Sequence, residues 1–370
     1  MSKAPRKHLR KDPRDFMAGG IFNIPRTVGT TGDKEIDQRI AQLVQDYGCG
    51  EAAPLIQELL TTALRMGKDD IAGADLKLYN RALKEMRASS RIFKPFTDER
   101  KISIYGSART KPDEPEFKAA RAFAEKMSEA GFMTITGAGD GIMGGAQEGA
   151  GRDFSFGLNI RLPFEQSANV TIDGDPKLIN YNYFFTRKLA FVKESDASAL
   201  FPGGFGTMDE GFEVLTLIQT GKALIYPVVM VDAPGGTYWK TWLQFITDHL
   251  FRLGLISADD FKLFKITDDI DEAVEEITGF YRNFHSYRFV KGKMVIRMNE
   301  TLSPETVSEL NQDFADILDE NDKSPEFRLS DALPQESDEP HLESMPRLVF
   351  SACRGKAGRI RELINRINQV

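Results

Sequence analysis

The chain has 370 residues, with 41% hydrophobic residues, 28% charged residues and a formal net charge of −7. This charge excludes a protein whose overall basic field holds nucleic acid, and no apolar run approaches the roughly 20 residues of a membrane span. Two cysteines far apart and four histidines without metal-binding spacing argue against a disulfide framework, a zinc site and histidine-based chemistry, so we expect a cytoplasmic protein without a bound metal.

Four regions follow one another along the chain. Residues 1–33 are rich in lysine and arginine but lack the apolar core of a signal peptide, so we expect a disordered basic arm rather than a nucleic-acid hook. Over residues 34–95, apolar residues recur at spacings of three and four, which predicts a helical N-terminal region. Residues 96–285 alternate short apolar strands with amphipathic helices, which is typical of a Rossmann-like, doubly wound parallel α/β sheet. Residues 286–370 favour a small α+β appendage with a flexible loop.

The pattern predicts the following elements within these regions. Strands of the central region are expected at residues 101–105, 132–136, 155–162, 197–201, 226–231 and 264–266. Helices are expected between and after them at residues 116–130, from about 144, and at 180–195, 207–220, 237–253 and 270–284. The appendage is expected to contain a hairpin over 287–298, a helix over 304–318, a strand over 348–352 and a final basic helix.

Three of the predicted strands end in glycine-rich turns: GSA at 106–108, GAGDGIMGG at 137–145 and PGGFGT at 202–207. Ligands of open parallel sheets bind beyond the carboxyl ends of the strands. Glycine there lets the backbone approach an anion, and the helix that follows presents free N–H groups to it. Three such turns at corresponding positions predict a ligand that carries phosphate.

Other phosphate-binding and hydrolytic motifs fit less well. No Gly-Lys pair is followed by Ser or Thr, so a Walker A loop is absent, and no G-x-S-x-G nucleophile elbow occurs. Gly139-x-Gly141-x-x-Gly144 matches a dinucleotide fingerprint, with Glu165 at the distance of a ribose-binding acid. That fingerprint normally follows the first strand of its unit, whereas this one follows the second, and no hydride-transfer partner is identifiable. We therefore do not favour a nicotinamide oxidoreductase.

The third turn leads into a predicted helix with Asp209 and Glu210 in its first turn. A carboxylate there can compensate the helix dipole. An acid kept beside a bound phosphate also indicates work on a developing positive charge, such as the oxocarbenium-like state of glycosidic cleavage. Glu213, one turn further on, is placed to support it. Arg187, on the preceding predicted helix, is either a ligand of phosphate or ribose oxygens, or a solvated charge on the helix face or a member of an ion pair.

These motifs resemble those of the Lonely Guy family, phosphoribohydrolases once mislabelled lysine decarboxylases. The resemblance covers about residues 102–284 and is most specific at PGGFGTMDE together with Arg187-Lys188, which are similar to the family's PGGxGTxxE and Arg-Lys elements. GSA is similar to the family's Gly-Ser-Ser. GAGDGIMGG is similar to its GGGxxGxMG, with Ala138 adding a methyl near the expected phosphate where the family usually has glycine. The two flanking regions resemble those of the longer bacterial members.

The resemblance implies hydrolysis of the N-glycosidic bond of a nucleoside 5′-monophosphate, AMP or an N6-substituted (cytokinin-type) AMP, to free base and ribose 5-phosphate. It implies a catalytic pair, in which Glu210 stabilises the ribosyl cation or orients water and Arg187 positions the substrate. It implies that phosphate and ribose are bound by Ser107, Gly139, Gly203, Gly204, Gly206 and Thr207. No metal or organic cofactor is required, and a homo-oligomer of two or more subunits is implied, without nucleic-acid or membrane partners.

An alternative from another class is a non-catalytic carrier of a nucleotide or of molybdenum cofactor, because molybdenum-cofactor carrier proteins resemble the same fold and glycine signature. The pair of Arg187 and Glu210 favours the hydrolase, since a carrier needs no such pair. The base is not identified by the sequence, and we expect its pocket wall at residues 180–185 or in a neighbouring subunit. We expect the N-terminal helices and the appendage to build the oligomer rather than to regulate the site.

Overall fold

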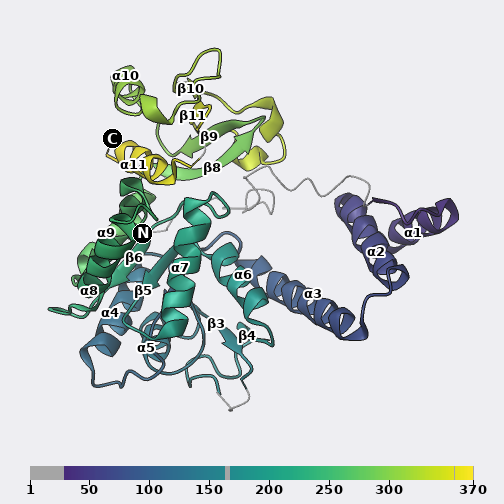
Figure 1. Ribbon diagram of the computed structural model, residues 1–370, viewed down its shortest axis with the longest axis horizontal. Coiled ribbons are helices and arrows are strands. Elements are labelled where there is room, and N and C mark those ends of the chain that lie inside the picture. Colours follow the sequence, from purple (N-terminus) through teal and green to yellow (C-terminus); the bar gives the residue numbers. More distant parts are fainter. Residues whose placement is uncertain (1–28, 163–166, 354, 370) are drawn as a thin grey trace, which may run out of the picture. The chain divides into compact units, whose positions relative to one another are not determined.

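The computed structural model describes residues 29–162, 167–353 and 355–369 (Figure 1). Two compact units are present, one within residues 20–87 and the other within residues 88–370, so the division falls inside helix α3 (Gly73–Phe93). The basic arm expected at residues 1–33 lies almost wholly outside the described residues. None of the helices in the described ranges is both long and apolar enough to cross a bilayer.

The N-terminal unit consists of α1 (Lys34–Tyr47), α2 (Ala53–Lys68) and most of α3, as the apolar spacing predicts. The side chain of Asp33 caps α1 by accepting hydrogen bonds from the amides of Glu35 and Ile36. Gly48 ends the same helix with a φ of 78°, a left-handed conformation that glycine adopts readily.

The larger unit contains a seven-stranded parallel sheet with the strand order β4-β3-β2-β1-β5-β6-β7, which confirms the predicted doubly wound α/β fold. Its strands are β1 (Arg100–Tyr105), β2 (Phe132–Thr136), β3 (Ser155–Ile160), β4 (Leu178–Tyr181), β5 (Ala197–Leu200), β6 (Val228–Val231) and β7 (Lys265–Thr267). The chain winds outward from β1 to β4 and returns to β5 on the other side of β1. The carboxyl ends of β1 and β5 are therefore the topological switch point, where such sheets bind ligands.

Helices cover both faces of this sheet (Figure 1). One face buries many alanines beneath α4 (Pro115–Glu129), α5 (Ile142–Ala150) and α9 (Ile270–Phe280). A Cβ at Gly149 of α5 would lie 2.0 Å from the carbonyl oxygen of Arg121, so this glycine permits close packing of α4 and α5. The other face buries larger side chains beneath α6 (Phe184–Glu194), α7 (Phe205–Gln219) and α8 (Tyr238–Phe245).

The edge strand β4 is absent from the sequence prediction, which places residues 180–195 in one helix and is wrong at the start of that segment. Residues 178–181 pair with β3 instead, and α6 begins at Phe184. The side-chain amide of Asn159 donates to Asn180 across the pair (3.0 Å), and the buried hydroxyl of Tyr181 is hydrogen-bonded to Ser89 (2.8 Å). A strand of four residues is too short for a periodic signal, and these contacts are made by distant segments.

The C-terminal part is a four-stranded antiparallel sheet of order β10-β11-β9-β8 with two helices. Its elements are β8 (Phe284–Val290), β9 (Lys293–Met298), α10 (Pro304–Asp313), β10 (Arg328–Ser330), β11 (Arg347–Phe350) and α11 (Ala357–Ile367). The hairpin is confirmed, and its turn residues Lys291 and Gly292 both have positive φ. One continuous apolar cluster includes Phe191 of α6, Met294 of β9 and Ile364 of α11, so both sheets of this unit share a core.

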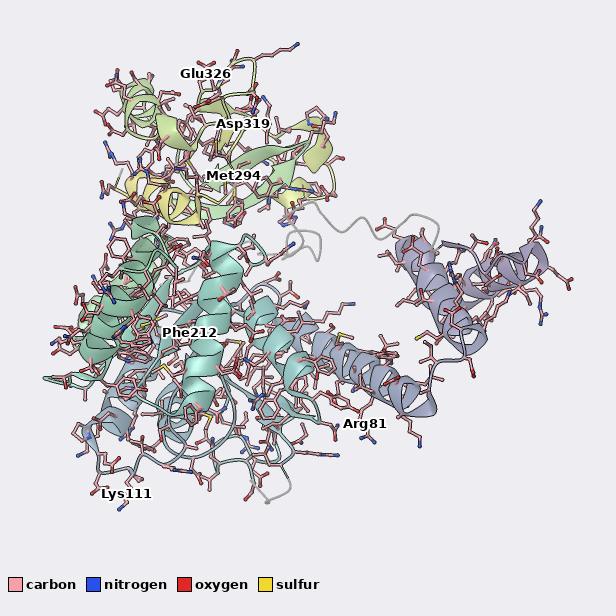
Figure 2. All side chains as sticks on the ribbon, viewed as in Figure 1. Arg81, Lys111, Phe212, Met294, Asp319 and Glu326 are labelled. Atoms are coloured by element: carbon pink, nitrogen blue, oxygen red, sulfur yellow. The ribbon has the colours of Figure 1, made fainter. Side chains whose placement is uncertain are left out.

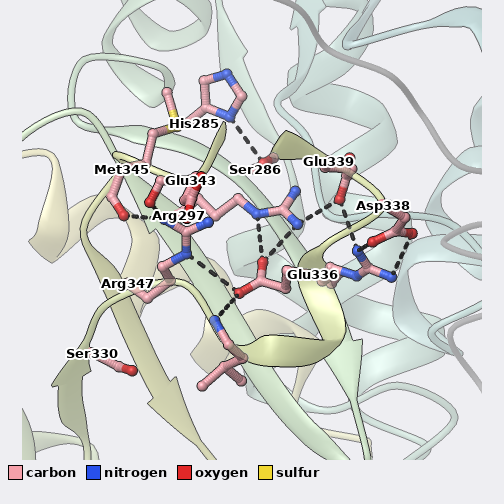
Figure 3. Close-up of polar contacts among 12 residues, drawn as sticks. His285, Ser286, Arg297, Ser330, Glu336, Asp338, Glu339, Glu343, Met345 and Arg347 are labelled. Atoms are coloured by element: carbon pink, nitrogen blue, oxygen red, sulfur yellow. Dashed lines mark hydrogen bonds and ion pairs between the residues drawn. The ribbon is translucent and has the colours of Figure 1, made fainter. Parts of the chain in front are cut away.

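Buried charges hold the segment between β10 and β11 against the second sheet (Figure 3). Glu336 accepts hydrogen bonds from Arg297 (2.7 Å and 2.9 Å) and lies 3.3 Å from the Nε of Arg347. Glu339 pairs with Arg288 at 2.9 Å and also with Arg297. These arginines belong to β8, β9 and β11, so the network joins three strands to one short segment.

Candidate functional site

A cavity of about 820 Å³ opens at the switch point between β1 and β5. Two hydrogen bonds hold the turns after these strands side by side: the amide of Phe201 donates to Tyr105 (2.8 Å), and that of Ser107 donates to Pro202 (3.1 Å). The cavity is lined by both turns and by residues of α6 and α7. Its volume lies in the range of roughly 300–1,000 Å³ that small-molecule sites occupy.

Arg187 of α6 and Glu210 of α7 line this cavity and face each other, with 3.7 Å between Nη2 and Oε1. The two side chains are 13% and 7% exposed, respectively. The guanidinium of Arg187 lies 5.0 Å from the ring centre of Phe184 and 5.7 Å from that of Phe191, one helical turn to either side. Nε of Arg187 has no hydrogen-bond partner within the described residues, whereas Oε2 of Glu210 lies 3.4 Å from the ammonium of Lys188. Buried polar atoms are normally satisfied, so the unpartnered Nε of Arg187 indicates a ligand-binding position.

Lys188 fixes the carboxylates of α7, a role that the sequence analysis did not assign. Its ammonium lies 3.0 Å from Asp209, 3.4 Å from Glu210 and 2.7 Å from Glu213. The expected support of Glu210 by Glu213 is therefore indirect and passes through Lys188. In the sequence, this role could have been inferred from Lys188 beside Arg187 on one predicted helix and three acidic residues at helical spacing on the next.

Burial is the main influence on the pKa of Glu210. It raises the pKa of the Glu210 carboxyl, although the charges of Lys188 and Arg187 act in the opposite direction. Burial also raises the pKa of the Tyr105 hydroxyl, and the nearby charge of Glu210 raises it further. Tyr105, at the end of β1, is among the residues that line the cavity, and its hydroxyl is buried. Tyr105 was not identified from the sequence, because the apolar pattern of its strand is that of an ordinary buried strand.

Helix α7 begins at Phe205, so the prediction that it opens at residue 207 is wrong. Asp209 and Glu210 consequently lie in the second turn, where compensation of the helix dipole is weaker. The buried Glu210 faces the cavity, and Phe212, two residues later, is partly exposed on the same helix (Figure 2). Phe205 and Gly206 line the cavity, and their amides belong to the first turn of the helix, where no intrahelical acceptor is available to them.

The three glycines of the third turn have different roles. A Cβ at Gly203 would lie 2.1 Å from Oγ1 of Thr207 and 2.9 Å from the amide nitrogen of Ser107, so packing requires glycine there. A Cβ at Gly204 or Gly206 would meet no atom within 4 Å. The space beside these two glycines belongs to the cavity, and it is where a phosphate can approach the backbone.

The second turn contributes less to the cavity than the sequence suggests. Gly137 lines it, and a Cβ there would lie 3.8 Å from Nη1 of Arg187. Gly139 is buried and is not among the lining residues; its carbonyl accepts a hydrogen bond from the Asn169 side chain (2.9 Å). Gly141 has a φ of 63°, and a Cβ there would lie 2.2 Å from the carbonyl oxygen of Ser107, so packing of the turns explains this part of the fingerprint. Glu165 lies outside the described residues.

Ala138 adopts a left-handed backbone conformation with a φ of 63° and is fully buried. A Cβ at Gly157 of β3 would lie 3.0 Å from the Ala138 methyl, which therefore faces the sheet. Ala138 does not line the cavity. The methyl that the sequence suggested near the phosphate thus faces β3 instead of the cavity.

Seven of the eight predicted site residues line this single cavity: Ser107, Arg187, Gly203, Gly204, Gly206, Thr207 and Glu210. The amide of Ser107 is already bonded, and its hydroxyl accepts a hydrogen bond from the Arg109 amide (3.1 Å), which leaves the hydroxyl proton for a ligand. Of the expected base-pocket wall at 180–185, Phe184 alone is among the described lining residues. Further apolar lining comes from Met143, Ile160, Leu162, Phe191 and Met208.

Residues 140–277 match a family model described as "Possible lysine decarboxylase". No curated protein matches the chain significantly. Among solved structures, the molybdenum cofactor binding protein of Rippkaea orientalis is 18% identical, with a TM-score of 0.35 over 48% of this chain and 94% of its own. The molybdenum cofactor carrier protein of Chlamydomonas reinhardtii is 17% identical, with a TM-score of 0.34 over 48% of this chain and 94% of its own. The family match includes Arg187 and Glu210, and it supports the resemblance to the Lonely Guy superfamily for residues 140–277.

Proposed function

We propose that this protein hydrolyses the N-glycosidic bond of a nucleoside 5′-monophosphate, AMP or an N6-substituted AMP, to free base and ribose 5-phosphate. One observation carries the proposal. Arg187 and Glu210 face each other, largely buried, in a cavity between two glycine turns, and Nε of Arg187 has no hydrogen-bond partner among the described residues.

The geometry suits a positively charged transition state. Cleavage transfers the electron pair of the C1′–N bond to the base and leaves positive charge on C1′ and the ring oxygen of ribose. The carboxylate of Glu210, held by Lys188, stabilises this charge, and the interaction is strong because the side chain is shielded from water. Water adds to C1′ and releases one proton, and the departing base takes up one proton. The balance is nucleotide plus water to base plus ribose 5-phosphate.

A purely structural role explains Glu210 poorly. Burial raises the pKa of its carboxyl, so keeping it ionised costs folding free energy. Groups held in an unfavourable charge state inside a cavity are typical of functional sites. Arg187 lowers that cost and is placed to bind a ribose or phosphate oxygen with its unused Nε–H.

The phosphate subsite follows from the third turn. The open space beside Gly204 and Gly206, the first amides of α7 and the hydroxyls of Ser107 and Thr207 together form a set of anion donors. The apolar side chains that line the cavity provide a surface for a flat base.

The test incubates purified protein with a panel of nucleoside monophosphates and measures free base and ribose 5-phosphate by chromatography. We expect release from AMP or its N6-substituted forms, and a loss of about a hundredfold or more for Glu210→Gln and Arg187→Ala. Asp209→Asn is the matched control: its side chain also contacts Lys188, but it is 61% exposed and does not line the cavity.

The outcomes separate the alternatives. Release that survives Glu210→Gln would keep the reaction and overturn the role of Glu210. Tight nucleotide binding without release from any substrate would contradict the hydrolase and support a carrier.

A further inference from the structure

The charges around the catalytic pair do not favour an anion before substrate binds. Arg187 and Lys188 contribute two positive charges, whereas Asp209, Glu210 and Glu213 contribute three negative charges, which leaves a formal charge of −1. Both cations are already engaged with these carboxylates. A phosphate monoester, which carries up to two negative charges, therefore needs another cation near the glycine turns.

Backbone amides and hydroxyls can orient a phosphate by hydrogen bonding, but they do not supply the positive charge that it needs. Ser107, Thr207 and the first residues of α7 line the cavity, but their hydroxyls and amides are neutral, and a helix N-terminus contributes only about half an elementary charge. Water in the open mouth of the cavity further screens that partial charge.

Arg109 is the one cationic side chain besides Arg187 among the described residues that line the cavity. It follows Ser107 by two residues in the turn after β1, and its amide donates to the Ser107 hydroxyl (3.1 Å), which fixes the backbone from which the side chain extends. The Arg109 side chain is exposed. The neighbouring Ser107 amide nitrogen lies 2.9 Å from the position of a Cβ on Gly203, so Arg109 starts close to the third glycine turn.

We propose that Arg109 binds the 5′-phosphate of the nucleotide and makes the site selective for monophosphates over nucleosides. This inference rests on the proposed function. A guanidinium stays charged at every relevant pH and forms two parallel hydrogen bonds to phosphate oxygens, which an ammonium does not. Arg109 would thus supply a positive charge at the phosphate end of the substrate, away from the bond that breaks. This charge offsets the net negative charge of Arg187, Lys188 and their three carboxylates.

The experiment compares the wild-type protein with Arg109→Ala and Arg109→Lys in steady-state hydrolysis of AMP and adenosine. Lys111→Ala is the matched control, because Lys111 is an exposed cation of the same segment that does not line the cavity (Figure 2). We expect Arg109→Ala to raise KM for AMP about tenfold to a hundredfold with a smaller change in kcat, and to leave the weak reaction with adenosine unchanged. Arg109→Lys should recover part of the loss, and Lys111→Ala should match the wild type.

Calorimetry with ribose 5-phosphate measures the same contact without turnover. Arg109→Ala should weaken this binding by the same factor, and added salt should weaken it less in this variant than in the wild type. Equal AMP kinetics in Arg109→Ala and the wild type would overturn the inference while leaving the hydrolase intact, as would equal losses for AMP and adenosine. Failure of the wild type to release any base would refute the proposed function, and the ribose 5-phosphate measurement would still decide the role of Arg109.

Discussion

At the scale of single residues, the buried carboxyl of Glu210 links activity to stability. Its pKa is raised by burial against the pull of Lys188 and Arg187. An acid that binds its proton more tightly in the folded than in the unfolded protein makes folding less favourable as pH rises from the unfolded to the folded pKa. The protein therefore tolerates a destabilising charge at the position where the proposed chemistry needs one.

Glu210→Gln should reveal this cost. Above the raised pKa the variant should unfold at a temperature equal to or higher than the wild type, because its neutral amide avoids burial of the charge. At pH values below the unfolded pKa of glutamate, where both side chains are neutral, the difference should vanish. Thermal unfolding of both proteins across pH 4 to 8 (roughly the range around ordinary and raised glutamate pKa values) tests this. If Glu210→Gln instead became less stable than the wild type as pH rises, the ion pairs of Glu210 would stabilise the folded protein by more than burial of its charge destabilises it.

At the scale of elements, the turn between β5 and α7 contains two kinds of glycine. Packing requires glycine at position 203, whereas Gly204 and Gly206 leave room for a ligand. Gly203→Ala should destabilise the protein by about 1–3 kcal/mol, because its methyl would overlap Thr207 and displace Ser107. Gly206→Ala should fold at least as stably as the wild type, since its methyl meets no atom and alanine favours a helix. Denaturant unfolding of both variants, with AMP hydrolysis in parallel, provides the comparison. Equal destabilisation by the two changes would contradict this division of roles.

At the scale of the whole chain, the larger unit is held together by two apolar clusters, one of which extends into its second sheet, and by the buried charge network of that sheet. The carboxyl of Glu336 is buried, which acts to raise its pKa, but the hydrogen bonds from the Leu333 amide and Arg297 outweigh burial and lower it. Its ion pairs therefore stabilise the fold above the unfolded pKa of glutamate, and this contribution is lost as pH falls through the lower, folded value.

Glu336→Gln should destabilise the protein by about 3–5 kcal/mol at neutral pH, because the buried Arg347 would lose the carboxylate of Glu336 and the buried Arg297 would keep only that of Glu339. Glu326→Gln is the control, since its pair with Arg328 lies at the surface (Figure 2) and should change stability by less than about 1 kcal/mol. Unfolding by urea at pH 7 measures both effects. A similar small loss in the two variants would mean that the network contributes no more than a surface pair.

Much of the candidate site was accessible from residue order alone. The alternation of strands and helices predicts a parallel sheet, and the glycine turns at three strand ends predict a ligand site at its carboxyl edge. Arg187 and Glu210 stand in motifs whose spacing is local, so they were identifiable without coordinates. The same local view assigned β4 to a helix, because a short edge strand is recognised only by its pairing with β3.

Side-chain partners and access to water come from packing between segments distant along the chain. Gly139 and Ala138 share a motif with Gly137, yet the first two are buried beside Asn169 and β3, and only Gly137 reaches the cavity. The ion pairs of Lys188 with the carboxylates of α7 and the position of Arg109 likewise depend on how α6, α7 and the turn after β1 pack together. Spacing along a chain reports which residues share a strand end or a helix face, whereas the fold sets which of them lose water and which remain open to a ligand.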